Sequence, residues 1–231
     1  MSRSPFRILF AVYPGMTQLD FTGPHQFLSR VPDSETLVAS PSGGAVPSEG
    51  LVFADTYRLA DVAQCDLLCV PGGVNALDMA LDAEFISEIQ RLGDGARYVT
   101  SVCTGSLILG AAGLLKEKRA ACHWAWRHLL PLFGAIPDEG RVVRDGRVFT
   151  GGGVTAGIDF ALTVLAEVAS EEVARTLQLG LEYDPMPPFA GGRPETTPPE
   201  ILARYRDRIK PLLVQYDAQA RKAAAQLSQS F

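Results

Sequence analysis

A cysteine at a predicted strand-to-helix turn is the residue of this sequence best placed to do chemistry. Cys103 lies in Ser101-Val-Cys-Thr-Gly105, between an apolar run typical of a buried strand and a run typical of a helix. Small residues on either side fit the sharp turn of a nucleophile elbow. The amide groups and positive dipole end of the next helix are expected to lower the thiol pKa and favour the thiolate nucleophile. A buried structural cysteine is the alternative interpretation.

The other three cysteines are expected to be packing residues. Cys69 lies inside an apolar run, Cys65 precedes that run, and Cys122 lies in Ala-Ala-Cys-His-Trp. Their spacing offers no second ligand pair of the zinc finger or knuckle type, so we expect no metal. Positively charged residues near the N-terminus precede only a short apolar stretch, and this pattern does not resemble a secretory signal. The longest apolar run is too short to span a membrane. A cytoplasmic, reducing location is therefore expected, where disulfides are rare.

Two further loops are expected beside the thiol, because ligands of open α/β sheets bind beyond the carboxyl ends of the strands. Asp20, in a predicted loop, could exchange protons with Cys103, and burial near a thiolate would raise its pKa. Local capping or turn formation is its alternative role. Gly72 and Gly73 follow a strand and could present backbone N–H groups to a developing negative charge, or could simply be turn residues.

Apolar runs alternate with helical patterns along the chain, which predicts an α/β three-layer sandwich with a mostly parallel, flavodoxin-like sheet. One domain is expected over residues 1–231, with a Pro- and Gly-rich loop at 184–199. Thr197-Pro-Pro-Glu200 is typical of a capping box that starts a terminal helix over 199–227. Strands are predicted at 7–13, 36–40, 66–70 and 97–102, hairpins at 45–55 and 141–150, and helices at 22–31, 82–92, 104–112, 124–132, 154–168 and from 170 onward.

Composition excludes several classes of protein. A 47% hydrophobic content supplies a core and argues against disorder, and 21 Lys+Arg against 26 Asp+Glu give a net charge of -5. A net negative charge gives no overall positive potential that would attract nucleic acid. From residue 201 onward the sequence contains six basic residues and only two acidic ones. We therefore expect the terminal helix to dock onto the acidic body or onto a partner subunit.

These segments together resemble the ThiJ/PfpI superfamily, whose fold is related to class I glutamine amidotransferases, and within it the isocyanide hydratases. The likeness spans nearly the whole chain. It is carried by Gln18-Leu-Asp20-Phe-Thr-Gly-Pro-His25, Val70-Pro-Gly-Gly73, Arg97-Tyr-Val-Thr-Ser-Val-Cys-Thr-Gly-Ser106, Gly110-Ala-Ala-Gly-Leu-Leu115, His123-Trp124, Arg141-Val-Val-Arg-Asp-Gly146, Thr150-Gly-Gly-Gly-Val-Thr-Ala-Gly-Ile-Asp159 and 178–188.

The resemblance implies a cysteine-dependent lyase that converts small-molecule isocyanides to N-substituted formamides through a covalent thioimidate. It implies Cys103 as the nucleophile and Asp20 as general acid and base, with no cofactor and a homodimeric assembly. Amidotransferases and proteases of the superfamily often carry histidine after the cysteine, whereas this chain has Thr104, which argues against peptide or amide hydrolysis. The residues expected to bind substrate or border its pocket are Thr104, Gly72, Gly73, Gly152 and Val154.

Other functions of similar domains stay open at this stage. A glyoxalase or protein-repair enzyme would use the same thiolate, and a redox sensor would oxidise Cys103 reversibly. Similar domains also sense ligands in AraC-type regulators, but those carry a helix-turn-helix domain after the sensor. Here only one long helix and a short tail follow residue 199, so DNA binding is not expected. His123 could approach the site or merely pack beside Trp124.

Overall fold

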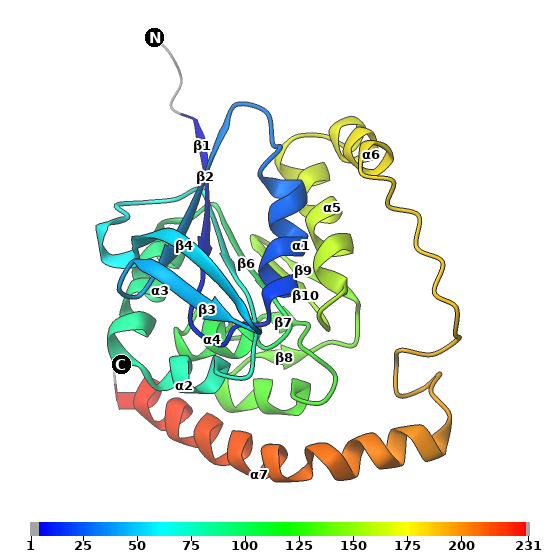
Figure 1. Ribbon diagram of the computed structural model, residues 1–231. Coiled ribbons are helices and arrows are strands. Elements are labelled where there is room, and N and C mark those ends of the chain that lie inside the picture. The colour runs from blue at the N-terminus through cyan, green and yellow to red at the C-terminus, as the bar shows by residue number, and fades with distance from the viewer. Residues whose placement is uncertain (1–4, 230–231) are drawn as a thin grey trace.

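A central sheet with helices on both faces forms the body of the protein (Figure 1). The computed structural model describes residues 5–229. Within that range the larger sheet has the strand order β3-β4-β2-β1-β5-β6-β10-β9. The strands are β1 Phe6–Ala11, β2 Ser34–Ser40, β3 Gly44–Ser48, β4 Leu51–Arg58, β5 Leu67–Val70, β6 Tyr98–Val102, β9 Val142–Asp145 and β10 Val148–Gly151, and a small separate sheet joins β7 Arg119–Ala120 to β8 Ile136–Pro137.

The middle of the sheet is parallel, as predicted. Strands β4, β2, β1, β5, β6 and β10 pair in parallel, and only the outer hairpin partners β3 and β9 are antiparallel. Strands β5 and β10 are buried along their whole length, which explains their continuous apolar character. In the pairing register Val70 lies beside Ser101 and Val102 lies beside Gly151. The loops that follow β5, β6 and β10 therefore meet at one edge.

Two groups of helices cover the sheet. Helices α1 and α5 pack against each other on one face, while α2, α3 and α4 contact one another on the other (Figure 1). Asp82 caps α3 by accepting a hydrogen bond from the Phe85 amide, and Ser170 caps α6 in the same way, at the positions where the sequence predicts these helices to start. The helices are α1 Gln18–Leu28, α2 Ala76–Leu81, α3 Ala83–Gly95, α4 Gly105–Ala111, α5 Ala156–Val168, α6 Glu171–Gly180 and α7 Pro199–Gln229, with 3-10 helices η1 Leu59–Asp61 and η2 Arg127–Phe133.

Three local predictions are wrong. Asp20 lies in the first turn of α1 rather than in a loop, because that helix begins at Gln18 and carries Pro24 inside it. Residues 124–132 form a 3-10 helix over part of that range instead of an α-helix. Thr197 does not cap α7, since its hydroxyl donates to the Arg193 carbonyl and the helix begins two residues later.

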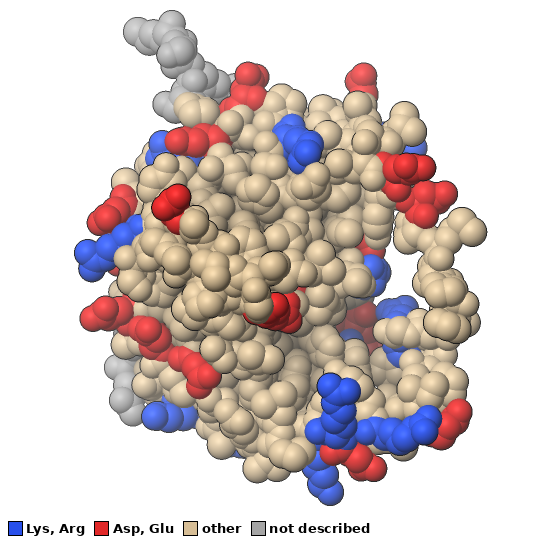
Figure 2. Space-filling model, viewed as in Figure 1, with Lys and Arg blue, Asp and Glu red and all other residues tan. Residues whose placement is uncertain are grey.

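The long helix α7 docks onto the body, one of the two arrangements expected for it. It packs against α2, α4 and η2 and buries Tyr216, Ala220 and Ala223. The segment between α6 and α7 forms no regular element and stands away from the body at the right of Figure 1. Figure 2 shows an opening between this segment and the body, with basic and acidic side chains inside it. Among the described residues, no helix combines the length and apolar character needed to cross a membrane.

Candidate active site

Cys103 occupies a true nucleophile elbow between β6 and α4. Its φ of 58° lies in the left-handed region, which L residues rarely adopt, and its amide donates to the Gly151 carbonyl at 3.1 Å. A Cβ on Gly105 would lie 2.2 Å from the Val70 carbonyl oxygen, so only glycine lets α4 approach β5 this closely. Backbone strain held by such surroundings is typical of functional sites. The elbow predicted from the sequence is confirmed, and Cys103 as a whole residue is 5% exposed.

Asp20 reaches the elbow from the first turn of α1. Its carboxyl is completely buried, and Oδ2 accepts a hydrogen bond of 3.0 Å from the Gly72 amide. The other oxygen, Oδ1, is buried with no hydrogen-bond partner in the described structure. A Cβ on Gly72 would lie 2.8 Å from Asp20 Oδ2 and 2.5 Å from the Thr104 nitrogen. Glycine is therefore required where the carboxyl, the elbow and this loop converge.

Thr104 joins the elbow to the same glycine loop. Its hydroxyl accepts a hydrogen bond of 2.9 Å from the Gly73 amide and faces the Gly73 carbonyl oxygen at 3.2 Å. The residue is 3% exposed. The amides of Gly72 and Gly73, expected to face a developing negative charge, thus already bind Asp20 and Thr104. A substrate anion would have to share these donors.

Burial sets the protonation of the pair. It raises the pKa of Asp20 from 3.8 to about 7, against the lowering effects of the Cys103 thiol and the Gly72 amide. Burial, followed by the nearby Asp20 carboxyl, raises the pKa of Cys103 well above its usual value, although the Thr104 amide lowers it. The expectation of a low thiol pKa is therefore wrong, because desolvation outweighs the amides of a short helix. The ionisable groups that interact with Asp20 are those of Tyr13, Glu49, Cys69, Cys103 and Cys122.

A pocket of about 310 Å³ lies beside the end of β10. Its lining includes Gly152, which follows the residue whose carbonyl binds the Cys103 amide, but it does not include Cys103 or Asp20. The amide of Ala121 donates to the Thr150 hydroxyl at 2.7 Å and its carbonyl accepts from Ser106, which brings the next residue, Cys122, close enough to Cys103 to influence its pKa. The pocket is lined on this side by Cys122, His123, Gly152, Gly153 and Val154, and on its outer side by 192–195.

His123 faces this pocket with a defined tautomer. Its Nδ1 accepts a hydrogen bond of 3.2 Å from the Ala125 amide, and its ring stacks on Trp124 at 5.7 Å. Burial lowers its pKa, so the ring is neutral and its proton is on Nε2. Of the two possibilities left open by the sequence, the structure shows the packing beside Trp124, and the ring also lines the pocket.

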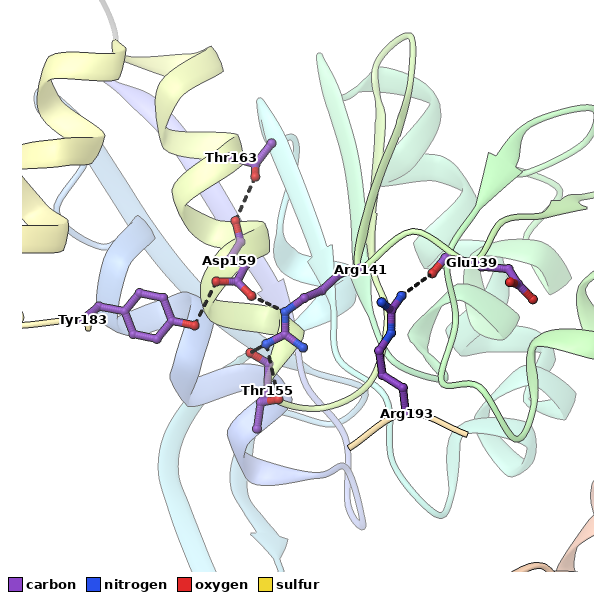
Figure 3. A network of polar contacts seen from close by, with 7 residues as sticks. All are labelled: Glu139, Arg141, Thr155, Asp159, Thr163, Tyr183 and Arg193. Atoms are coloured by element: carbon purple, nitrogen blue, oxygen red, sulfur yellow. Dashed lines mark hydrogen bonds and ion pairs between the residues drawn. The ribbon is translucent and has the colours of Figure 1, made fainter. Parts of the chain in front are cut away.

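A polar network supports the turn that follows β10 (Figure 3). Arg141 forms an ion pair with Asp159 of α5 and donates to the Thr155 carbonyl at 3.0 Å. The Tyr183 hydroxyl donates to the other carboxylate oxygen of Asp159 at 2.8 Å. Arg193, from the segment after α6, donates to the Glu139 carbonyl at 3.4 Å. The network thus ties the 152–155 turn to α5 and to the chain beyond α6.

Several sequence candidates lie away from the site, and two tyrosines near it gave no sequence signal. Cys65 is buried near Arg7 and Arg91, and all four cysteines are free. His25 packs on the rings of Phe10 and Phe21. By contrast, the hydroxyls of two tyrosines far apart in the sequence donate to carbonyls of the 71–74 loop: Tyr13 to Pro71 at 3.0 Å and Tyr216 to Gly73 and Val74.

A strained cysteine at a strand-to-helix elbow, with a buried carboxyl against it, defines a cysteine-dependent enzyme on a parallel α/β sheet. The sequence model of the DJ-1/PfpI family matches residues 6–167. The chain belongs to the DJ-1/PfpI family, which confirms the resemblance seen in its motifs.

Individual members of the family are also similar to this chain. The isonitrile hydratase of Pseudomonas putida is 46% identical over 223 residues, covering 96% of this chain and 98% of that protein. The crystal structure of a ThiJ/PfpI family protein from Pseudomonas syringae has a TM-score of 0.91 at 41% identity, covering 94% of this chain and 90% of that one. DJ-1beta of Drosophila melanogaster, with a TM-score of 0.70 and 22% identity over 77% of this chain and 98% of its own, shares the fold.

Proposed function

We propose that this protein is an isocyanide hydratase, which adds water to isocyanides to give N-substituted formamides, with Cys103 as nucleophile and Asp20 as proton carrier. The observation that carries this proposal is the buried pair formed by the strained Cys103 thiol and the Asp20 carboxyl, whose pKa is about 7. The 46% identity to an isonitrile hydratase over nearly the whole chain supports the substrate class.

In its reactive form the pair holds one proton, which must move twice. Because the thiol pKa is raised well above its usual value, Cys103 keeps its proton at neutral pH, and the Asp20 pKa of about 7 leaves about half of the carboxyls ionised and able to accept that proton. As an isocyanide approaches, the Asp20 carboxylate takes the thiol proton and the sulfur attacks the terminal carbon, which is electrophilic. The new C–S bond leaves a carbanion, which Asp20 protonates. The product is a thioimidate, R–N=CH–S–Cys103.

Hydrolysis of the thioimidate uses the same carboxylate in reverse. Asp20, now ionised, removes a proton from water and passes that proton to the thioimidate nitrogen, while the hydroxide oxygen adds to the thioimidate carbon. The tetrahedral intermediate then expels the Cys103 sulfur and forms the C=O bond of R–NH–CHO. The proton released from the hydroxyl group returns to the Asp20–Cys103 pair. The sum of both halves is isocyanide plus water to formamide.

The neighbouring residues hold this pair and the substrate. The Gly72 amide keeps the Asp20 carboxyl against the elbow, and the Thr104 hydroxyl fixes the elbow to Gly73. Gly152 and Val154 line the pocket beside the elbow and would contact the nitrogen substituent of the isocyanide. The rest of that substituent would extend toward His123.

A steady-state assay on para-nitrophenyl isocyanide tests the proposal. Wild-type protein should release the formamide, while Cys103→Ala and Asp20→Asn should each lose about a thousandfold or more in kcat, as expected when a nucleophile or its proton carrier is removed. Wild-type rates of formamide release by Cys103→Ala would overturn the mechanism. A kcat/KM for methylglyoxal above that for the isocyanide would instead favour the glyoxalase activity of the superfamily.

We also propose a cytoplasmic homodimer. Four free, buried cysteines are consistent with a reducing compartment. Light scattering at micromolar concentration should give twice the mass of the chain, and a monomer would contradict the proposed assembly.

A further inference from the structure

Tyr13 lies completely buried between the end of β1 and the start of α1, with its hydroxyl against the loop that follows β5. The hydroxyl donates a hydrogen bond of 3.0 Å to the Pro71 carbonyl oxygen. The ring packs edge-on against Phe85 of α3, with 6.0 Å between the ring centroids. Burial raises the phenol pKa well above its usual value, so the hydroxyl stays protonated and remains a donor at neutral and mildly basic pH.

The carbonyl that Tyr13 binds belongs to the same peptide unit as the amide that binds the catalytic carboxyl. This unit is planar and trans, so the Pro71 carbonyl and the Gly72 N–H point in opposite directions and turn together. Tyr13 holds the unit on its carbonyl side, and on its amide side Gly72 donates to Asp20 Oδ2 at 3.0 Å. One peptide therefore connects the phenol to the carboxyl through two hydrogen bonds.

Gly72 gives this peptide little restraint of its own. A glycine has no Cβ, so its backbone rotates more freely than that of any other residue, and a Cβ here would lie 2.8 Å from Asp20 Oδ2. The orientation of the Gly72 amide is therefore set by its hydrogen-bonded surroundings. The next peptide is held separately, because its carbonyl accepts from the Thr17 amide at 2.8 Å and its amide donates to the Thr104 hydroxyl at 2.9 Å.

The hydrogen bond from Tyr13 also affects how strongly the Gly72 amide donates. Hydrogen bonds in series polarise the groups that they join, by roughly 10–30% per bond, so a carbonyl that accepts a bond makes the N–H of its own peptide a better donor. An amide binds an ionised carboxylate more strongly than a protonated carboxyl. The Gly72 amide accordingly lowers the pKa of Asp20, as the Cys103 thiol does, against the larger effect of burial.

We propose that Tyr13 is a positioning residue of the active site, which holds and polarises the Pro71–Gly72 peptide so that its amide stabilises the Asp20 carboxylate. This inference rests on the proposed role of Asp20 as proton carrier. The ionised carboxyl is the form that takes the thiol proton, so the tyrosine increases the fraction of the protein that is ready to react.

The substitution Tyr13→Phe tests the proposal, because it removes the hydroxyl and keeps the ring against Phe85. It removes no charge, since the phenol is neutral. The other titratable groups that interact with Asp20 stay in place: Glu49 after β3, Cys69 of β5, Cys103 at the elbow and Cys122 after β7. We expect the Asp20 pKa to rise by about half a unit, a threefold change in proton affinity. Carbon-13 NMR of protein labelled at the aspartate carboxyl carbon measures this pKa, with the Asp20 signal assigned by its absence from Asp20→Asn.

The acid limb of kcat/KM for the isocyanide should move with this pKa. At pH 7 the Tyr13→Phe protein should be about twofold slower than wild type. At pH 9, where the carboxyl is ionised in both proteins, the two values should be nearly equal. A variant that is slower by the same factor at both pH values would contradict the inference, because its loss would not depend on the protonation of Asp20.

Tyr216→Phe is the matched control. Tyr216 is also buried and its hydroxyl donates to carbonyls of the same loop, but neither of these carbonyls shares a peptide with the Gly72 amide. Both variants should lose stability, since each leaves a buried carbonyl without a donor, whereas the control should keep the wild-type Asp20 pKa. A wild-type Asp20 pKa in Tyr13→Phe overturns the inference, and so does an equal shift in Tyr216→Phe.

A second substitution decides the question if Tyr13→Phe does not fold. An ortho-fluorotyrosine at position 13 keeps the ring and the hydroxyl, and the fluorine makes the phenol more acidic and thus a stronger donor. The Asp20 pKa should then fall, opposite to the shift in Tyr13→Phe, and an unchanged or raised pKa overturns the inference. If wild-type protein does not hydrate isocyanides, the proposed function fails, while the Asp20 titration still decides the role of Tyr13.

Discussion

The buried carboxyl of Asp20 should make the protein less stable than a variant without the charge, and the size of this effect should depend on pH. Its pKa is raised from 3.8 to about 7 on folding. A raised carboxyl pKa means that the folded state binds the proton more tightly, so stability is lost as pH rises from about 4 to about 7 and the loss is constant above that. The pKa difference corresponds to about 4 kcal/mol. Asp20→Asn, which is neutral at every pH, should escape this loss.

Urea unfolding at pH 5, 6, 7 and 8 measures the effect as the difference in unfolding free energy between Asp20→Asn and wild type. The difference should increase over this range and reach its plateau near pH 7–8, with the variant the more stable protein while it loses activity. Asp94→Asn, at an exposed position on α3, is the control for the same change of side chain and should leave the unfolding free energy close to that of wild type. An Asp20→Asn protein that is less stable than wild type by the same amount at all four pH values would refute the buried-charge reasoning.

Three further outcomes follow from the geometry of the elbow. Gly105→Ala should lower the unfolding free energy by about 3 kcal/mol, because the new Cβ would lie 2.2 Å from a strand carbonyl, whereas Gly95→Ala, with no atom within 4 Å, should change it little; equal urea midpoints for the two would contradict this. Thr104→Val leaves the buried Gly73 amide without its acceptor and should lower the unfolding free energy by about 1–3 kcal/mol in the same assay. An unfolding free energy equal to that of wild type would contradict this. Iodoacetamide should alkylate Cys103 slowly at pH 7 and faster above pH 9, and a fast, pH-independent rate from pH 6 would show a thiolate instead.

The sheet and the position of the elbow that carries Cys103 could be predicted from the sequence because they depend on local patterns. Strands buried on both faces read as apolar runs, and the small residues around Cys103 are those a strand-to-helix turn requires. The hairpin at Asp145-Gly146 and the caps at Asp82 and Ser170 also depend on neighbouring residues only. These features are therefore found in the folded protein where the sequence predicts them.

What could not be predicted depends on contacts between distant segments. Pro24 suggested a helix beginning near Thr22, but the first amide of α1 is instead bound by Glu49, 31 residues away, and the helix begins at Gln18. The thiol pKa follows from how completely the tertiary structure removes water from Cys103. Tyr216 contacts a loop 142 residues earlier in the chain, and nothing in its local sequence indicates that contact.

Direct detection of the covalent intermediate tests the central claim most sharply. Wild-type protein mixed with excess aryl isocyanide and quenched in acid within milliseconds should show an added mass of one isocyanide molecule, located by peptide mass spectrometry on Cys103. The adduct should form and decay at rates that account for formamide release, and Cys103→Ala should show neither adduct nor product. Formamide release without any adduct on Cys103, at a rate that survives in Cys103→Ala, would contradict the account.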